Sequence, residues 1–167
     1  SLIGGIGKTP TFSVRFENQK DFTGGAGIVA KHLKSAGAEV ALSTVLGNDA
    51  LKTHVRRDLE AAGVNCIPII DPTRPTTNKN AFIAGGYRLL KVDTLDNRTV
   101  SEKTLKRLCR SIRNTPADAV VFSDFRHGIF NRHTIPELTA AIPADVFRAA
   151  DSQVASRWGN ILEFEGF

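Results

Sequence analysis

The chain has 167 residues, of which 41% are hydrophobic and 23% charged, and its formal net charge is +5. This length suits one domain, and the composition excludes a disordered tail, a collagen-like repeat and a disulfide-stapled miniprotein. No stretch approaches the roughly 20 apolar residues of a membrane span and no signal-peptide pattern opens the chain, so we expect a cytoplasmic location and no membrane partner. Because aromatic residues do not alternate with the basic ones, we do not expect nucleic acid as a partner.

The two cysteines, Cys66 and Cys109, lie far apart in apolar runs. We therefore expect buried, reduced thiols. Since no group of His, Cys, Asp and Glu has metal-ligand spacing, we expect no metal site.

The first half of the chain is predicted to alternate strands and helices. Apolar runs and β-favouring residues predict strands over residues 11–16, 40–46 and 64–70. Apolar residues at helical spacing predict one helix over 27–36 and another that is capped by Asn48 or Asp49 and closed by Gly63. A glycine-rich turn at 21–25 precedes the first helix, and a loop follows at 71–77.

The second half begins with a predicted hairpin, in which Gly85-Gly86 joins strands over 81–84 and 87–92. Further elements are a helix over 101–113 capped by Ser101, strands over 118–122 and 145–150, a helix over 134–141 and a partly helical tail over 156–167. Lys103, Lys106, Arg107, Arg110 and Arg113 line one side of the first of these helices. That side is either an anion-binding surface or an ordinary solvated helix back, and we favour the latter.

This alternation predicts an α/β fold with a mostly parallel sheet. The hairpin and the strand at 11–16 interrupt the alternation, and we expect them to form a small β flap beside the sheet.

Residues 4–9 (G-G-I-G-K-T) superficially suggest a phosphate-binding P-loop. The P-loop pattern requires a glycine at position 2, which is Leu2, and a helix after the loop, where Pro10 leads into a predicted strand. We therefore reject a P-loop, and with it a nucleotide-binding domain of that kind.

Three features carry the candidate site. Gly24, Gly25 and Gly27 open a helix whose free N–H groups favour a polar ligand, although the same glycines also suit a tight turn with close helix packing, and the sequence leaves both readings open. Asp124 and Asp151 follow predicted strands, and the carboxyl ends of parallel strands meet at the edge where ligands bind. Taken alone, each Asp is more often a helix cap or turn residue than a ligand.

The chain resembles the ribokinase-like (PfkB) carbohydrate kinases, most of all the kinase module of bifunctional heptose kinase/ADP-heptose synthases. The matching segments occur in the same order and are residues 24–30 (G-G-A-G-I-V-A), 74–79 (R-P-T-T-N-K), 89–93 (L-L-K-V-D), 123–128 (S-D-F-R-H-G) and 150–153 (A-D-S-Q). The resemblance implies a three-layer, Rossmann-like core, about residues 22–72 and 98–167. It also implies a β lid, about residues 9–20 and 74–97.

The resemblance further implies ATP-dependent phosphoryl transfer to a hydroxyl of a sugar or sugar phosphate, with Mg²⁺ offsetting the phosphate charge. Gly24, Gly25 and Gly27 would let the sugar approach the helix start, the lid residues Lys79, Lys91 and Asp93 would surround it, and Asp124 and Asp151 would lie on the phosphate side. We also expect a homodimer formed through the lid.

Four positions depart from the family pattern: Ile28, Ala81, His127 and Gln153 stand where the family has Asn, Arg, Lys and Lys. No G-x-G-D segment, which in the family holds the catalytic base, occurs in the sequence, and the ATP-binding segment is absent with it. We therefore expect a fragment, incomplete at both ends, that carries no catalytic base and does not turn over. The alternative is a non-catalytic sugar-binding or dimerisation module derived from such a kinase.

Overall fold

The computed structural model describes residues 2–4, 12–153, 164 and 166–167. Residues 5–9 of the rejected P-loop and most of the tail at 156–167 therefore lie outside the described residues. None of the described helices is long and apolar enough to cross a membrane.

The described elements follow the predicted alternation closely. The helices are α1 (Ala26–Ser35), α2 (Leu51–Ala61), α3 (Glu102–Asn114) and α4 (Thr134–Thr139). The strands are β1 (Leu2–Gly4), β2 (Ser13–Val14), β3 (Ala41–Leu46), β4 (Asn65–Ile70), β5 (Asn78–Ala84), β6 (Tyr87–Thr94), β7 (Ala119–Asp124) and β8 (Phe147–Ser152). The α/β prediction is confirmed, and the main differences concern where strands end.

The parallel strands form two separate pairs in the described residues, rather than the single sheet that we expected. β3 pairs in parallel with β4 across α2, and β7 pairs in parallel with β8 across α4. No described backbone ladder joins the two pairs. Side chains connect them instead, because Ile69 of β4 and Phe122 of β7 belong to the same buried cluster.

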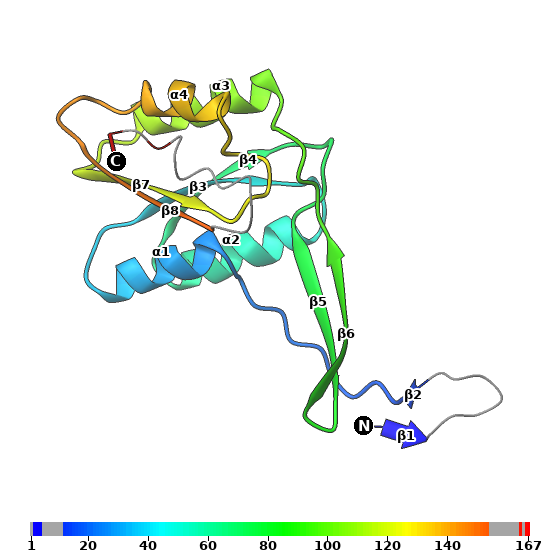
Figure 1. Cartoon of the computed structure of the whole chain (residues 1–167). Coiled ribbons are helices and arrows are strands. Elements are labelled where there is room, and N and C mark those ends of the chain that lie inside the picture. Colours follow the sequence, from blue (N-terminus) through cyan, green and yellow to red (C-terminus); the bar gives the residue numbers. More distant parts are fainter. Residues whose placement is uncertain (1, 5–11, 154–163, 165) are drawn as a thin grey trace.

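Helices cover the strands from both sides. In Figure 1, α3 and α4 lie above the strands and α1 and α2 lie below them. Ser101 caps α3 as predicted by accepting a hydrogen bond from the Thr104 N–H, and the buried Leu105 and Leu108 of α3 face the larger cluster. Ala30, Leu59 and Val64 form a smaller cluster on the α1–α2 side.

Aromatic side chains extend the larger cluster toward the end of the chain. Phe122 lies 5.0 Å, between ring centroids, from both Phe130 and Phe167, and 6.1 Å from Phe164. The sequence patterns did not single out this aromatic group. Phe164, the buried member from the tail, lies outside any helix or strand.

The predicted hairpin is confirmed and is longer than expected. Gly85 and Gly86 have φ of 57° and 80°, the left-handed conformation that a two-residue hairpin turn of this kind requires and that glycine adopts without strain. β5 and β6 pair antiparallel and extend away from the body of the molecule (Figure 1).

The predicted strand at 11–16 is largely wrong. Within its described residues only Ser13–Val14 (β2) is extended and paired, with β1 as its partner. The flanking Phe12 and Phe16 are exposed, and a β-favouring sequence without a neighbouring strand gains no ladder hydrogen bonds. β2 is not hydrogen-bonded to the hairpin, so the two do not form one sheet.

Candidate active site at the carboxyl edge of the strands

The two candidate carboxylates lie at the same ends of two paired strands but on opposite faces of the pair. Asp124 is the last residue of β7 and is paired with Ser152, whereas Asp151 is paired with Ser123, the neighbour of Asp124. Both strands run further than predicted, so the carboxylates lie within the strand ends rather than after them. The expected edge nevertheless carries both.

Asp124 holds the edge together. It is 3% exposed, and its carboxylate accepts hydrogen bonds from the Arg126 backbone N–H at 2.7 Å and from the Ser152 hydroxyl at 2.8 Å. The Gln153 N–H donates to the Asp124 carbonyl at 3.2 Å. These bonds tie the end of β8 to the loop that follows β7. Asp151, by contrast, is exposed.

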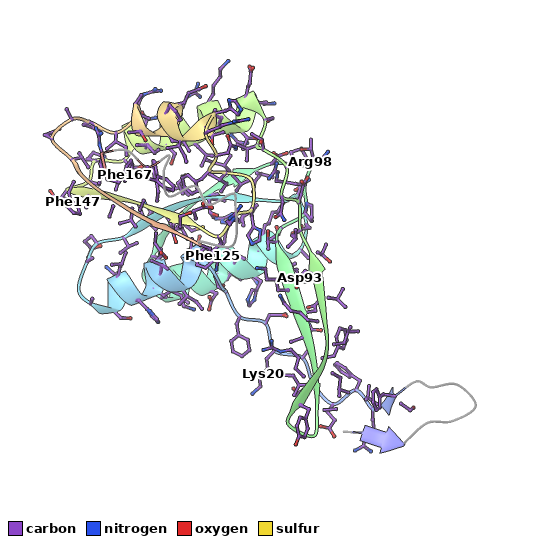
Figure 2. All side chains as sticks on the ribbon, in the orientation of Figure 1. Lys20, Asp93, Arg98, Phe125, Phe147 and Phe167 are labelled. Carbon is purple, nitrogen blue, oxygen red and sulfur yellow. The ribbon has the colours of Figure 1, made fainter. Side chains whose placement is uncertain are left out.

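The glycine-led start of α1 lies against the same loop. Gly25 has φ of 54°, and a Cβ placed on it would lie 3.5 Å from Cδ2 of Phe125, the residue directly after Asp124. Figure 2 shows Phe125 next to this end of α1. The helix start and the acidic strand ends therefore share one edge.

The structure divides the two readings that the sequence left open for these glycines. A Cβ on Gly27 would lie 2.3 Å from Cγ2 of Thr23, so this glycine is required for close packing. A Cβ on Gly24 would meet nothing within 4 Å, and no side chain caps the helix start. Gly24 and Gly25 therefore leave the free backbone N–H groups approachable, whereas Gly27 serves packing.

The three lid residues lie on one face of the hairpin. Lys79 is paired with Asp93, Ala81 is paired with Lys91, and paired residues project from the same face of a sheet. The Lys91 ammonium lies 3.0 Å from the Asp93 carboxylate. The other face carries the apolar pair Phe82 and Leu90.

The base of the hairpin reaches the loop after β7 through His127. Its Nδ1 lies 2.9 Å from Oδ1 of Asn97, which follows β6. Burial lowers the pKa of His127, the charge of Lys79 lowers it further, and the carboxylates of Asp124 and Asp93 oppose the change. The charges of both hairpin strands thus act on the loop that follows Asp124.

Sequence reasoning missed a buried polar network beside this edge. Asp71, directly after β4, accepts hydrogen bonds from the Thr73 N–H at 3.0 Å and from the Thr104 hydroxyl at 3.1 Å, and it is ion-paired with Arg74. Asp49, after β3, accepts from the Thr76 N–H at 2.7 Å. The available signal was position, because both carboxylates also follow strands.

Hydrogen bonding outweighs burial in setting the acidity of these two carboxylates. Burial raises the pKa of Asp71, but the bonds from Thr73 and Thr104 and the charge of Arg74 together lower it below its usual value. Burial also raises the pKa of Asp49, but the hydrogen bonds from Thr76 and Lys52 outweigh this effect and lower the pKa below its usual value. Both groups are ionised anchors of the loops rather than free ligands.

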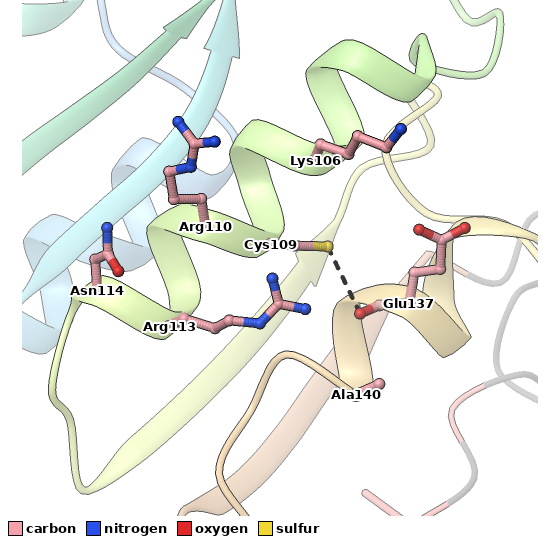
Figure 3. A pocket seen from close by; sticks show the side chains of 7 residues that line it. All are labelled: Lys106, Cys109, Arg110, Arg113, Asn114, Glu137 and Ala140. Atoms are coloured by element: carbon pink, nitrogen blue, oxygen red, sulfur yellow. Dashed lines mark hydrogen bonds between the residues drawn. The ribbon is translucent and has the colours of Figure 1, made fainter.

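The structure has no metal-type cluster of His, Cys, Asp and Glu among the described residues. An open pocket of about 400 Å³ lies elsewhere, between α3 and α4 (Figure 3). It is lined by the basic residues Lys106, Arg110 and Arg113, and Arg110 extends away from Glu137, whereas Arg113 extends toward α4. Because these cationic groups do not converge, the geometry favours a solvated helix back over an anion site.

The family assignment rests on comparison with known proteins. The model of the pfkB family carbohydrate kinases matches residues 7–155. The chain belongs to this family. The match covers the start of α1, the hairpin and the ends of both β7 and β8, which are the parts that form the edge described above.

The similar curated proteins are all much longer than this chain. It is 31% identical over 123 residues to the Bifunctional protein HldE of Caulobacter vibrioides, an alignment that covers 73% of this chain and 25% of that protein. It is 32% identical over 123 residues to the protein of the same name from a Marinomonas strain, covering 72% and 26%. The chain therefore spans about a quarter of the length of these relatives.

Proposed function

We propose that this chain forms the sugar-binding part of a PfkB carbohydrate kinase, an enzyme that transfers a phosphoryl group from ATP to a hydroxyl of a sugar or sugar phosphate. The observation that carries the proposal is the family match over residues 7–155, together with the shared edge of α1, β7 and β8. The resemblance to heptose kinase modules favours a heptose phosphate among the possible acceptors.

The acceptor would lie between this edge and the polar face of the hairpin. Gly24 and Gly25 supply approachable backbone N–H groups for sugar hydroxyls, while Gly27 acts only through packing. Lys79 and Lys91 supply cations for an acceptor phosphate, and Asp93 orients Lys91 through their ion pair. A three-layer core with the hairpin as its lid is the arrangement that this role requires.

The residues present fit only part of an ATP·Mg²⁺ site. Mg²⁺ commonly takes one or two carboxylates and completes its coordination with phosphates and water, and the exposed Asp151 suits that use. Asp124 is committed to Arg126 and Ser152 and instead fixes the loop. Bound ATP and Mg²⁺ would supply the phosphoryl group and neutralise its charge.

The 167 residues alone contain no G-x-G-D segment. We propose that they bind the acceptor without turning over, because the family's catalytic base belongs to that segment. A cytoplasmic location, where ATP is available, belongs to the same proposal.

A second candidate is a non-catalytic sugar-binding or dimerisation module. Ile28 favours it, because this apolar residue is exposed near the start of α1, where the family has a hydrogen-bonding Asn. Ala81 likewise leaves the hairpin face opposite Lys91 without an Arg.

Binding of sugar phosphates to the chain, measured by calorimetry over a panel that includes heptose phosphates, tests the proposal. We expect Lys91→Ala to weaken binding roughly tenfold, since a hydrogen bond to a charged group contributes about 1.5–3 kcal/mol. The matched control is Lys106→Ala on α3, an exposed lysine that lines the pocket between α3 and α4, which should leave affinity unchanged. Absence of binding across the panel, or equal losses in both variants, would contradict the assignment. Binding without ADP formation by a protein that contains these residues together with a G-x-G-D segment would favour the second candidate.

A further inference from the structure

Arg74 makes more contacts across the candidate site than any residue proposed to touch the sugar. Its Nη2 donates to the carbonyl oxygens of Arg98 at 3.1 Å and Thr99 at 3.3 Å, and its Nη1 donates to the carbonyl of His127 at 3.4 Å. Its Nε lies 3.4 Å from the Asp71 carboxylate. The side chain is only 8% exposed, although Arg98 and Thr99, whose carbonyls it bonds, are exposed residues.

The contacts join three segments that are far apart in sequence. Arg74 precedes β5, residues 98–99 follow β6, and His127 follows β7 in the loop that begins at Asp124. One guanidinium group therefore connects the entry of the hairpin, the exit of the hairpin and the loop that begins at Asp124. The carboxylate of Asp71, the residue directly after β4, forms an ion pair with the same group.

Two weaker connections run alongside. His127 contacts Asn97, and the Val100 N–H donates to the Gly128 carbonyl at 3.0 Å. Both connect only the exit of the hairpin with the loop, whereas Arg74 alone among these contacts also includes the entry of the hairpin. The geometry of the hairpin relative to the loop therefore depends chiefly on Arg74.

We propose that Arg74 is a positioning residue that couples the β5–β6 hairpin to the loop after β7, so that the cations of the hairpin face the acidic strand ends at a fixed separation. This inference rests on the proposed function for its catalytic meaning. Its structural part stands on the contacts alone. A lysine would keep the charge toward Asp71 but offers one ammonium point instead of a planar fork, so it would not serve three carbonyls on two segments.

Amide hydrogen exchange on the chain tests the coupling without any ligand. In Arg74→Lys, we expect exchange to rise roughly tenfold both at the hairpin base, near residues 78 and 94, and in the loop at 125–128, while the β3–β4 ladder is unchanged. The matched control is Arg98→Lys, because Arg98 is an exposed arginine whose side chain pairs only with Asp96 in the described contacts. Faster exchange confined to residues 71–77, or a loop at 125–128 that is unaffected, would overturn the proposal.

Kinetics on a protein that contains these residues together with a G-x-G-D segment supply the second arm. We expect Arg74→Lys to raise KM for the sugar severalfold more than it lowers kcat, and Arg98→Lys to change neither. An unchanged KM with the exchange effect present would refute the positioning role while leaving the proposed kinase function intact. If the protein phosphorylates no sugar, the function fails, and the exchange result still decides the coupling.

Discussion

Two regions contribute to the candidate site, the carboxyl edge of the parallel strands and the β5–β6 hairpin. They differ in how far their residues are buried and bonded within the chain. At the edge, Asp71 and Asp124 are buried and satisfied by hydrogen bonds within the chain. Along the hairpin, every residue of β6 is exposed. The edge is therefore preorganised before any ligand binds, whereas the hairpin can gain most of its contacts from a ligand or a second chain. A site of this kind would combine a preorganised edge with a hairpin that is anchored at its base and exposed along its length.

The largest expected effect comes from breaking the edge. Asp71→Ala should lower the free energy of unfolding by about 3 kcal/mol, because it leaves the buried Arg74 guanidinium without its counter-ion and the Thr104 hydroxyl without its acceptor. Urea denaturation monitored by circular dichroism measures this loss. Asp96→Ala is the comparison at the hairpin exit, because Asp96 accepts hydrogen bonds from the Arg98 backbone N–H and from its exposed guanidinium, and it should lower the urea midpoint less than Asp71→Ala does. Equal midpoints for the two variants would show that the edge is no more ordered than the hairpin exit.

A charge on the apolar face of the hairpin should have a smaller effect on folding but a clear one on association. Leu90 is 55% exposed and its partner Phe82 is 51% exposed, so Leu90→Lys should change the free energy of unfolding by less than about 0.5 kcal/mol. If the chain forms a homodimer through the lid, as the sequence analysis predicts, and this face is the contact, the same substitution should shift it to monomer in sedimentation experiments. Arg88→Lys, near the turn, is the control. A wild-type chain that sediments as a monomer at high concentration would contradict the predicted dimer.

The smallest expected effect is a pH dependence at the junction of the two regions. Burial and Lys79 lower the folded-state pKa of His127. Below its unfolded value near 6.5 the unfolded chain binds the proton more readily, so stability should fall as the pH drops from about 7 toward 5. His127→Gln should make the urea midpoint less dependent on pH over this range and leave the midpoint unchanged near pH 8. If the urea midpoint changes equally with pH in the wild-type chain and in His127→Gln, His127 is not shielded by the hairpin.

Local patterns were sufficient for most elements. Ser101 as a cap, the Gly85-Gly86 turn and the helix opened by the glycines at 24–27 were all read correctly from neighbouring residues. The strand at 11–16 failed, because a strand depends on a partner that its own sequence does not reveal. Arg74 and Asp71 were missed for a similar reason, since their partners lie up to 53 residues away in the sequence.

The sequence by itself determined the alternation of helices and strands, the hairpin and the order of motifs that places the chain among the pfkB family kinases, because periodicity, caps and turns act over a few residues. Only the tertiary structure decided that the parallel strands form two pairs joined by side chains, that Gly27 serves packing while Gly24 stays open, and that Arg74 connects the hairpin to the acidic edge. These outcomes depend on contacts between residues that are far apart in the sequence, and a pattern of neighbouring residues does not specify such contacts.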